Sequence, residues 1–554
     1  MTAEAVKAQP RSTTASGRGG IFSGRSGRVL RENLTAYLFL LPALLIVFIY
    51  GIFPILFAGY VSLYKWRIRQ GEYRGIENYV TAMGDLAYVF FFVIALALIY
   101  VGASTAWKAV KDGRSSNVAP MFPLISLIPG GILAYGISQI MLRFITYFAQ
   151  ERAIDAGEAE VLGSVSNGFL FIVVGVVVNN LVNRWQRQTT VTKSKYAVLP
   201  NFGLASLTTM LSIGLGVMMG FFTWRELQSA ENVIEAIPRI QSTFLGIVIL
   251  IVGYFLWSWG SQQTSNTKLI GSVLGAVVLI AGGVFFIMNW ENWTTGGSDE
   301  FFLSLRVTIF YSLFTVPFQL AISLGLAYLL FQKIAAKGMF RIIYFIPYIA
   351  PTVATAGIFR VIFSLREEGL ANWAVDSIFQ GAALKWLQES AGAVSAFGES
   401  LGIAGAESWT IGGPSLALFV IILFNIWVFV GYDTVIFLAG LGNIPNTLYE
   451  AGKIDGANGW QLFRHITVPL LSPTVYFLSV ISVIGTFKAF NHIWVLRQPE
   501  AQGTVDTASV YFFSTFLRQT RFGYSTAMAM VLFVIILILF LIQQRMASRR
   551  VFYG

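Results

Sequence analysis

The sequence contains no cysteine and only two histidines, His465 and His492. The absence of cysteine excludes a disulfide framework, thiol catalysis and cysteine-ligated metal sites. Two histidines are too few to build a typical histidine-ligated metal site without many other ligands. We therefore expect no metal and no other cofactor.

Charged residues are also scarce, because they make up 12% of 554 residues where a soluble chain has roughly 25%. Hydrophobic residues make up 56%, and they form long runs near the ~20 residues that cross a bilayer as a helix. A water-soluble core would interrupt such runs with polar faces. The composition therefore predicts an all-α, polytopic transmembrane helical bundle.

Twelve hydrophobic runs are long enough to be counted as membrane spans. They cover residues 34–63, 87–107, 121–148, a run ending near 182, 202–223, 244–259, 269–290, 303–331, 342–363, 416–441, 470–496 and 526–542. An even number places both termini on one side of the membrane.

The formal charge of +11 could indicate nucleic-acid binding, but the basic residues cluster at the ends of the hydrophobic runs. Positive charge there holds a loop on the cytoplasmic side. Basic and acid-rich loops alternate along the chain, with one exception, the basic segment KWRIRQGEYRG at 65–75 that follows the first run. We expect a plasma-membrane protein in a lipid bilayer with both termini cytoplasmic and no nucleic-acid partner.

The segment at 441–469 reads LGNIPNTLYEAGKIDGANGWQLFRHITVP and falls on the cytoplasmic side. Pro445 predicts the start of a short helix that carries Glu450, and Gly456 permits a turn with positive φ. A second amphipathic stretch follows through Trp460, and Pro469 is expected to open the next membrane helix. This helix-turn-helix has apolar residues that it cannot bury alone, so it predicts a protein partner.

The same segment resembles the EAA loop of ABC importer permeases. The residues at the matching places are Glu450, Ala451, Asp455, Gly456, Ile466 and Pro469. Two positions depart from the motif, since Gly452 replaces its second alanine and Val468 replaces its leucine. Gly452 weakens the helix by ~1 kcal/mol, which predicts a shorter or bent helix. The Ile-Pro pair at 444–445 and the Asp-Gly-Ala triplet at 455–457 are similar to the carbohydrate branch.

Four further stretches resemble core helices of that branch: SLGLAYLL, KGMFRIIYFIPYIAPTVA, FNIWVFVGYDTVIFLAGLGNIP and FGYSTAMAMVLFVI. The chain is thus identified as a member of the maltose-type (MalF-like) carbohydrate permeases, the binding-protein-dependent transport system inner membrane components. The resemblance implies a six-helix type I ABC importer permease core. It also implies two ATP-binding subunits, a second homologous permease and an external substrate-binding protein as partners. The residues expected to couple to the ATPase are Glu450, Ala451, Gly452, Asp455, Gly456, Ile466 and Pro469.

The resemblance divides the chain into a core and an insertion. The expected parts are a basic cytoplasmic tail at 1–33, the first core helix and an external segment at 34–85, an inserted six-span region at 86–298, five core spans at 299–545 and a tail at 546–554. The core includes an external loop at 365–413 with short amphipathic helices and the coupling loop at 441–469. In maltose-type relatives the insertion is a soluble domain, whereas here it is hydrophobic, with packing faces of small residues at GVMMG (216–220) and GSVLG (271–275).

Polar residues inside the spans are candidates for the substrate path, because they are costly in lipid. These are Asn425, Tyr432, Phe487, Lys488 and Asn491. Helical spacing places Phe487 and Asn491 on one face with Lys488 beside it. Aromatic rings with amide and charged groups suit a sugar, and the resemblance implies an oligosaccharide such as a maltodextrin.

Three alternatives stay open. The permease could carry another polar solute such as a glycerol phosphate. A secondary transporter would need paired intramembrane carboxylates, and Asp433 is nearly alone; a membrane enzyme would need a reactive constellation that is missing. A phosphate-loop near-match at 19–26, GGIFSGRS, has Arg25 where lysine is needed and no preceding strand. We therefore expect no enzyme activity and no ATPase motif in this chain.

Overall fold

The computed structural model describes residues 24–116, 118–149, 154–189, 201–230, 232–260, 266–332, 335–408, 413–501 and 503–550. It divides into two compact units, residues 1–59 and 60–554. Most of the N-terminal tail expected at 1–33 lies outside the described residues. Helix α1 already begins at Gly24, which moves the helix start upstream of the expected boundary.

The first unit is one long helical run. It consists of α1 (Gly24–Val47), a π-helical turn η1 (Phe48–Ile52) and most of α2 (Phe53–Val61). Thr35–Val61 is long and apolar enough to cross a membrane, close to the predicted first span. The π turn stands directly before Pro54, where the missing backbone N–H disturbs regular α-helical bonding.

A short antiparallel hairpin, which the sequence reading did not predict, opens the second unit. Strands β1 (Tyr64–Trp66) and β2 (Gln70–Tyr73) pair with Tyr64 opposite Tyr73 and Trp66 opposite Gln70. Helix α3 (Glu77–Met83) follows, and its Asn78 holds the hairpin. The Asn78 side-chain amide donates to the carbonyls of Ser62 (2.8 Å) and Tyr64 (3.0 Å).

Seven helices lie among the described residues between 86 and 294. They are α4 (Leu86–Ser115), α5 (Met121–Ile125), α6 (Leu127–Ala149), α7 (Ile154–Thr189), α8 (Gly203–Ser229), α9 (Val233–Gly260) and α10 (Asn266–Thr294). Helix α4 packs on α8, α6 on α7 and α8, and α9 on α10. A methyl group on Gly216 would lie 2.8 Å from the carbonyl oxygen of Ala95, and one on Gly275 would overlap the backbone of Trp257. The small-residue packing faces predicted from the sequence are therefore confirmed.

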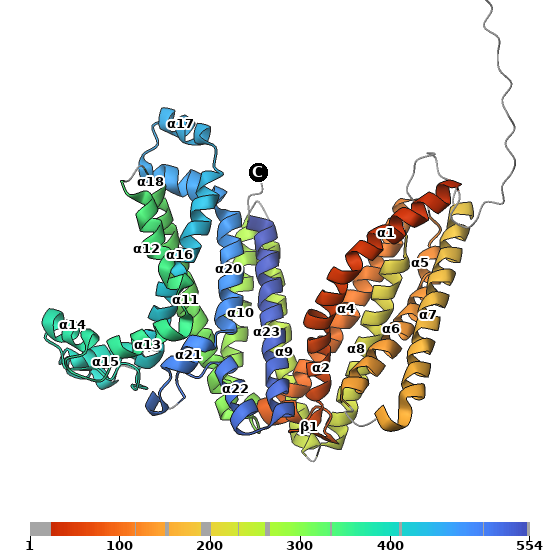
Figure 1. The fold of residues 1–554 in the computed structure, drawn as a ribbon, viewed down its shortest axis with the longest axis horizontal. Helices are drawn as coiled ribbons and strands as arrows, with labels where there is room; N and C mark the ends of the chain where they lie inside the picture. The colour runs from red at the N-terminus through yellow and green to blue at the C-terminus, as the bar shows by residue number, and fades with distance from the viewer. Residues whose placement is uncertain are drawn as a thin grey trace, which may run out of the picture. The chain divides into compact units, whose positions relative to one another are not determined.

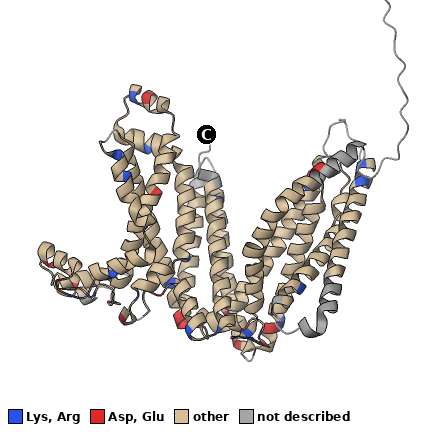
Figure 2. Cartoon of the chain, viewed as in Figure 1, with Lys and Arg blue, Asp and Glu red and all other residues tan. Residues whose placement is uncertain are grey.

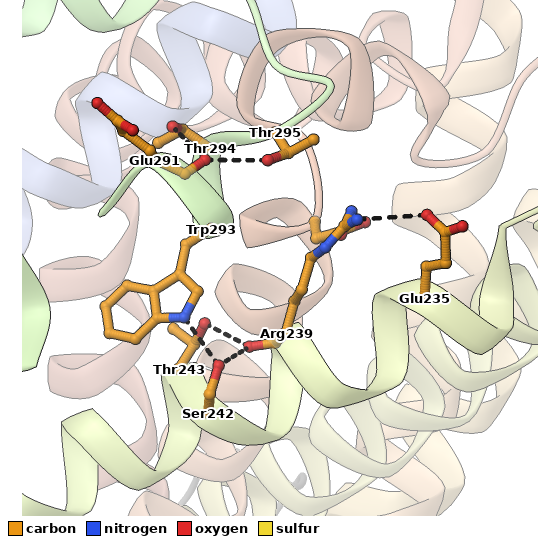
Figure 3. Close-up of polar contacts among 9 residues, drawn as sticks. Glu235, Arg239, Ser242, Thr243, Glu291, Trp293, Thr294 and Thr295 are labelled. Atoms are coloured by element: carbon orange, nitrogen blue, oxygen red, sulfur yellow. Dashed lines mark hydrogen bonds and ion pairs between the residues drawn. The ribbon is translucent and has the colours of Figure 1, made fainter. Parts of the chain in front are cut away.

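The two ends of this helical stretch meet at one point. The backbone N–H of Ser298 donates to the carbonyl of Ala82 at 3.1 Å, and a Cβ on Gly84 would overlap the carbonyl oxygen of Thr295. Around this junction, Arg239 of α9 pairs with Asp85 (3.0 Å) and Glu235 (3.3 Å). The indole of the buried Trp293 donates to the Ser242 hydroxyl at 2.8 Å (Figure 3).

The remaining elements run from 299 to 550 (Figure 1). They are α11 (Asp299–Phe331), α12 (Lys337–Ile349), α13 (Thr352–Ile362), α14 (Leu370–Phe379), α15 (Ala393–Ser400), η2 (Ala406–Ser408), α16 (Leu416–Gly442), α17 (Asn446–Ile454), α18 (Gly459–Leu462), η3 (Phe463–Thr467), α19 (Val468–Leu470), α20 (Ser472–Phe487), α21 (Asn491–Leu496), η4 (Pro499–Ala501), α22 (Ala508–Arg518) and α23 (Phe522–Arg550). Helix α16 packs on α11, α12 and α20. Two short helices, α14 and α15, lie in the loop where the sequence predicted them.

Among the described residues, ten helices are long and apolar enough to span a membrane, or up to twelve if two bent pairs each count as one span. The total agrees with the predicted bundle of about twelve spans. For two of the spans, the prediction of one continuous helix is wrong. The run at 342–363 bends by 96° between α12 and α13, where Pro351 forces Ala350 into an extended conformation. The run at 470–496 is interrupted at 488–490, and α20 is itself bent by 63° from the helix before it.

Candidate functional site

The coupling segment, residues 445–470, contains all seven predicted coupling residues. Glu450, Ala451 and Gly452 lie in α17, and Asp455 with Gly456 forms the turn after it. Further along, Ile466 lies in η3 and Pro469 in α19. The structure therefore brings the whole motif into one projecting element.

The turn after α17 is a Schellman motif. Gly456 has φ +80°, the N–H of Ala457 donates to Gly452 (2.9 Å), and the N–H of Gly456 donates to Lys453 (3.1 Å). These two bonds satisfy carbonyls that a helix end otherwise leaves unpaired. The positive φ predicted at Gly456 is confirmed. Asn458 then forms a capping box with Gln461 and starts α18 immediately.

Gly452 stands where the helices before and after this turn approach most closely. A Cβ at this position would lie 2.7 Å from Cδ2 of Leu462 and 3.2 Å from Cδ1 of Ile466. The departure from the alanine of the motif therefore has a packing reason, in addition to its cost in helix propensity.

The helix that follows does not begin as predicted. Pro469 lies inside α19, and the long helix α20 starts at Ser472 after the chain bends. Pro473 stands in the first turn of α20, where its missing N–H costs nothing because that N–H would have no partner in the helix. On the other side of the segment, Tyr449 bonds the buried Thr467 hydroxyl at 3.0 Å.

The projecting surface carries large apolar side chains in the open. Ile454 is 86% exposed, Trp460 is 66% exposed, and Leu448 is exposed beside them. Glu450 and Asp455 are exposed around them. Figure 1 shows α17 at one end of the helices, joined to the rest through α18. Apolar side chains rimmed by charge in this way mark a protein–protein contact surface.

A cavity of about 310 Å³ lies between α12, α16 and the α20–α21 break. Four of the five predicted substrate-path residues line it: Asn425, Tyr432, Lys488 and Asn491. Lys488 and Asn491 are exposed within it, whereas Asn425 is buried. Tyr348 stacks on Tyr432 with ring centroids 4.6 Å apart.

Phe487 is the exception. It is 5% exposed and packs with Ala508 and Leu532 instead of lining the cavity. The expectation that Phe487 and Asn491 share one helix face is wrong, because α20 ends at Phe487 and α21 starts at Asn491. Lys488 and Phe490 adopt non-helical dihedral angles between them, and this turns the following residues toward the cavity.

Gln319 of α11 is the residue that the sequence reading missed. It is 2% exposed, and its amide donates to Asp433 at 2.7 Å and to Ser482 at 3.4 Å. The Asn425 amide donates to the Gln319 carbonyl at 3.1 Å. One side chain thus links α11, α16 and α20 in the wall of the cavity, which Gln319, Asp433 and Ser482 line together with Asn425. The signal available in the sequence was a side-chain amide within an apolar run, two residues after Pro317.

A second buried bond orients the cavity wall. The Tyr311 hydroxyl and His492 Nε2 are 2.7 Å apart, and the His492 ring stacks on Phe424 at 5.3 Å. No group of three or more His, Cys, Asp or Glu side chains that could hold a metal occurs among the described residues.

Comparisons with known proteins agree on one family. The family model described as "Binding-protein-dependent transport system inner membrane component" matches residues 318–552. The chain is 31% identical over 272 residues to the arabinooligosaccharides transport system permease protein AraP of Bacillus subtilis, a match that covers 49% of this chain and 79% of the relative.

Two further relatives are similar over comparable lengths. The trehalose/maltose transport system permease protein MalF of Thermococcus litoralis is 28% identical, covering 43% of this chain and 72% of the relative. The lactose transport system permease protein LacF of Rhizobium radiobacter is 29% identical, covering 45% and 77%. A crystal structure of a bacterial ABC transporter involved in the import of the acidic polysaccharide alginate is 22% identical with a TM-score of 0.39, over 50% of this chain and 95% of that one.

Proposed function

Because the chain belongs to the family of binding-protein-dependent transport system inner membrane components, we propose that it is a permease subunit that admits a carbohydrate in an ATP-driven importer. The relatives' names support a carbohydrate, since they specify arabinooligosaccharides, trehalose or maltose, and lactose. The observation that carries the proposal is the exposed coupling segment, which resembles the family's motif at Glu450, Ala451, Asp455, Gly456, Ile466 and Pro469.

The coupling segment supports a separate ATPase as partner. Leu448, Ile454 and Trp460 are apolar and exposed at the tip of an element that cannot cover them itself. Docking them into a groove of an ATP-hydrolysing subunit would remove their apolar surface from water at about 25 cal/mol per Å². Glu450 and Asp455 would then set the orientation by charge at the rim. In this proposal, the energy of transport comes from two separate ATP-binding subunits, and this chain supplies no ATPase.

The division into core and insertion is supported by the junction at 82–85 and 295–298. Residues 34–85 and 299–545 form the six-helix core in this proposal, and 86–298 is a membrane-embedded insertion that leaves and rejoins it at one point. The bond from Ser298 to Ala82 joins the two edges of the core directly. A second homologous permease completes the path in this proposal, because the resemblance to the family implies that its permeases work in pairs.

The cavity supports passage of a sugar. Lys488 and Asn491 present hydrogen-bond donors on exposed side chains that line the cavity, and the stacked Tyr348–Tyr432 pair presents apolar ring faces. Sugar hydroxyls need hydrogen bonds, while the faces of the pyranose ring stack on aromatic side chains. In this arrangement both termini are cytoplasmic, and the 365–413 loop faces the external solute-binding protein.

Co-purification of an ATPase from intact membranes tests the proposal. We expect the unaltered chain to recover an ATP-hydrolysing subunit and Glu450→Lys to lose it. Glu399→Lys is the matched control, because it makes the same charge change on an exposed residue of α15. Recovery of no ATPase by the unaltered chain would refute the proposal.

A further inference from the structure

The hairpin at 64–73 carries the basic residues that break the charge pattern of the loops. Lys65, Arg67 and Arg69 are exposed, and no carboxylate of the described residues pairs with them. Arg74, by contrast, is paired with Glu77 at 3.0 Å. Ile68, at the turn between the cations, is 82% exposed. We call Lys65, Arg67, Ile68 and Arg69 the basic tip.

The base of this hairpin is held firmly. A Cβ on Gly523 would overlap the carbonyl oxygen of Tyr64, so β1 lies directly on the first turn of α23. The Tyr64 and Tyr73 rings meet edge-on at 5.3 Å, and the Asn78 amide donates to the same Tyr64 carbonyl at 3.0 Å. A tip fixed in this way loses little conformational entropy when it binds.

The basic tip lies at the end of the helices away from the coupling segment. Helix α16 leads from Leu416 to the coupling segment, and α23 starts beside the hairpin at Phe522. Figure 1 shows β1 and α17 at opposite ends of the helices of this unit, and Figure 2 shows charged residues gathered near the helix ends. Loops rich in Lys and Arg usually lie on the cytoplasmic side of a membrane, whereas this hairpin is external in the proposed topology. A binding role therefore explains its unpaired cations better than membrane orientation does.

We propose that the basic tip docks an acidic surface of the external solute-binding protein, with Ile68 as the apolar contact between the cations. This inference rests on the proposed importer function. Three cations close in sequence to one exposed apolar side chain would steer an acidic partner and fix its register. A soluble protein can reach this tip, because all four of its side chains are exposed.

The test uses the complete transporter in vesicles of phosphatidylcholine, which are neutral. Sugar uptake is measured against the concentration of binding protein for the unaltered chain and for the triple variant Lys65→Glu, Arg67→Glu and Arg69→Glu. We expect the half-maximal concentration to rise about tenfold at low salt, with the rate at saturation unchanged. The difference should shrink near 0.5 M salt, where charge interactions are screened within a few ångströms.

Two variants of the same hairpin serve as controls. Arg67→Lys with Arg69→Lys keeps the charge and should leave the half-maximal concentration unchanged. Glu72→Lys removes an exposed acid beside the tip and should lower that concentration about twofold.

An unchanged half-maximal concentration in the triple variant would overturn the docking. So would an effect that appears only with added anionic lipid and does not depend on the binding protein, since it would assign the tip to the lipid surface. If the unaltered transporter takes up sugar without any binding protein, the proposed importer fails as well. If uptake by the unaltered transporter requires the binding protein but the triple variant behaves like it, only the docking is refuted.

Discussion

Replacing Gln319 by leucine tests the buried hydrogen-bond network in the wall of the cavity. The substitution removes the bonds from Gln319 to Asp433 (2.7 Å) and from Asn425 to Gln319 (3.1 Å). Hydrogen bonds between membrane helices average about 0.6 kcal/mol and reach about 1.7 kcal/mol. The short bond to a buried carboxylate belongs at the upper end of that range, and the longer amide bond belongs near its average. Gln319→Leu should therefore lower the free energy of unfolding by about 2 kcal/mol.

The assay is reversible unfolding by sodium dodecyl sulfate in mixed micelles, arranged as a double-mutant cycle with Asp433→Leu. Each single variant leaves one buried polar group without its partner, whereas leucine at both positions removes the carboxylate together with its donor. The loss of unfolding free energy in the double variant should therefore be smaller than the sum of the two single losses, by about 1 kcal/mol or more. Thr209→Val removes a 3.3 Å bond to Gly102 between α4 and α8 and shares no partner with Gln319, so its effect should simply add. Strict additivity of Gln319→Leu with Asp433→Leu would refute the network.

Three further predictions follow from the fold. Gly431→Ala places a methyl group on the carbonyl oxygen of Tyr344 and should lower the free energy of unfolding by about 1–3 kcal/mol. Gly325→Ala is the control and should have no such cost, because the space around Gly325 is open. Equal effects of the two variants would contradict the tight crossing of α12 and α16. Gly456→Ala strains the φ +80° turn by roughly 1 kcal/mol and should weaken ATPase co-purification, whereas Gly459→Ala should leave it intact. Replacement of residues 86–296 by a short Gly-Ser linker should leave a core that inserts into the membrane and still recovers the ATPase; loss of insertion would show that the six inserted spans are needed to build the core.

The sequence was sufficient for the bundle and for the coupling segment. Membrane spans are readable because a lipid-facing helix must be apolar throughout. The turn at Gly456 was predictable because it depends on local backbone geometry alone. The close approach of Gly452 to Leu462 could not be read, since it depends on how two short helices cross.

The cavity was predicted only in part, for a physical reason. Helical spacing places residues correctly only while the helix continues, and α20 ends at Phe487. Phe487 therefore packs in the core, while Lys488 and Asn491 line the cavity. Gln319 was missed because its importance comes from Asp433 and Asn425, which are more than one hundred residues away in the chain. The hairpin was missed because its strands are only three and four residues long.

ATP-driven sugar uptake by the reconstituted transporter is the decisive measurement for the proposed importer function. Vesicles containing this chain with its second permease and ATPase subunits would be given the binding protein, internal ATP and labelled arabino-oligosaccharide, maltose or lactose. We predict that at least one of these sugars is taken up and that its uptake requires ATP. Uptake should be lost together with ATPase recovery in Glu450→Lys and should persist in Glu399→Lys. Uptake that continues without ATPase subunits, driven by an ion gradient, would contradict this prediction.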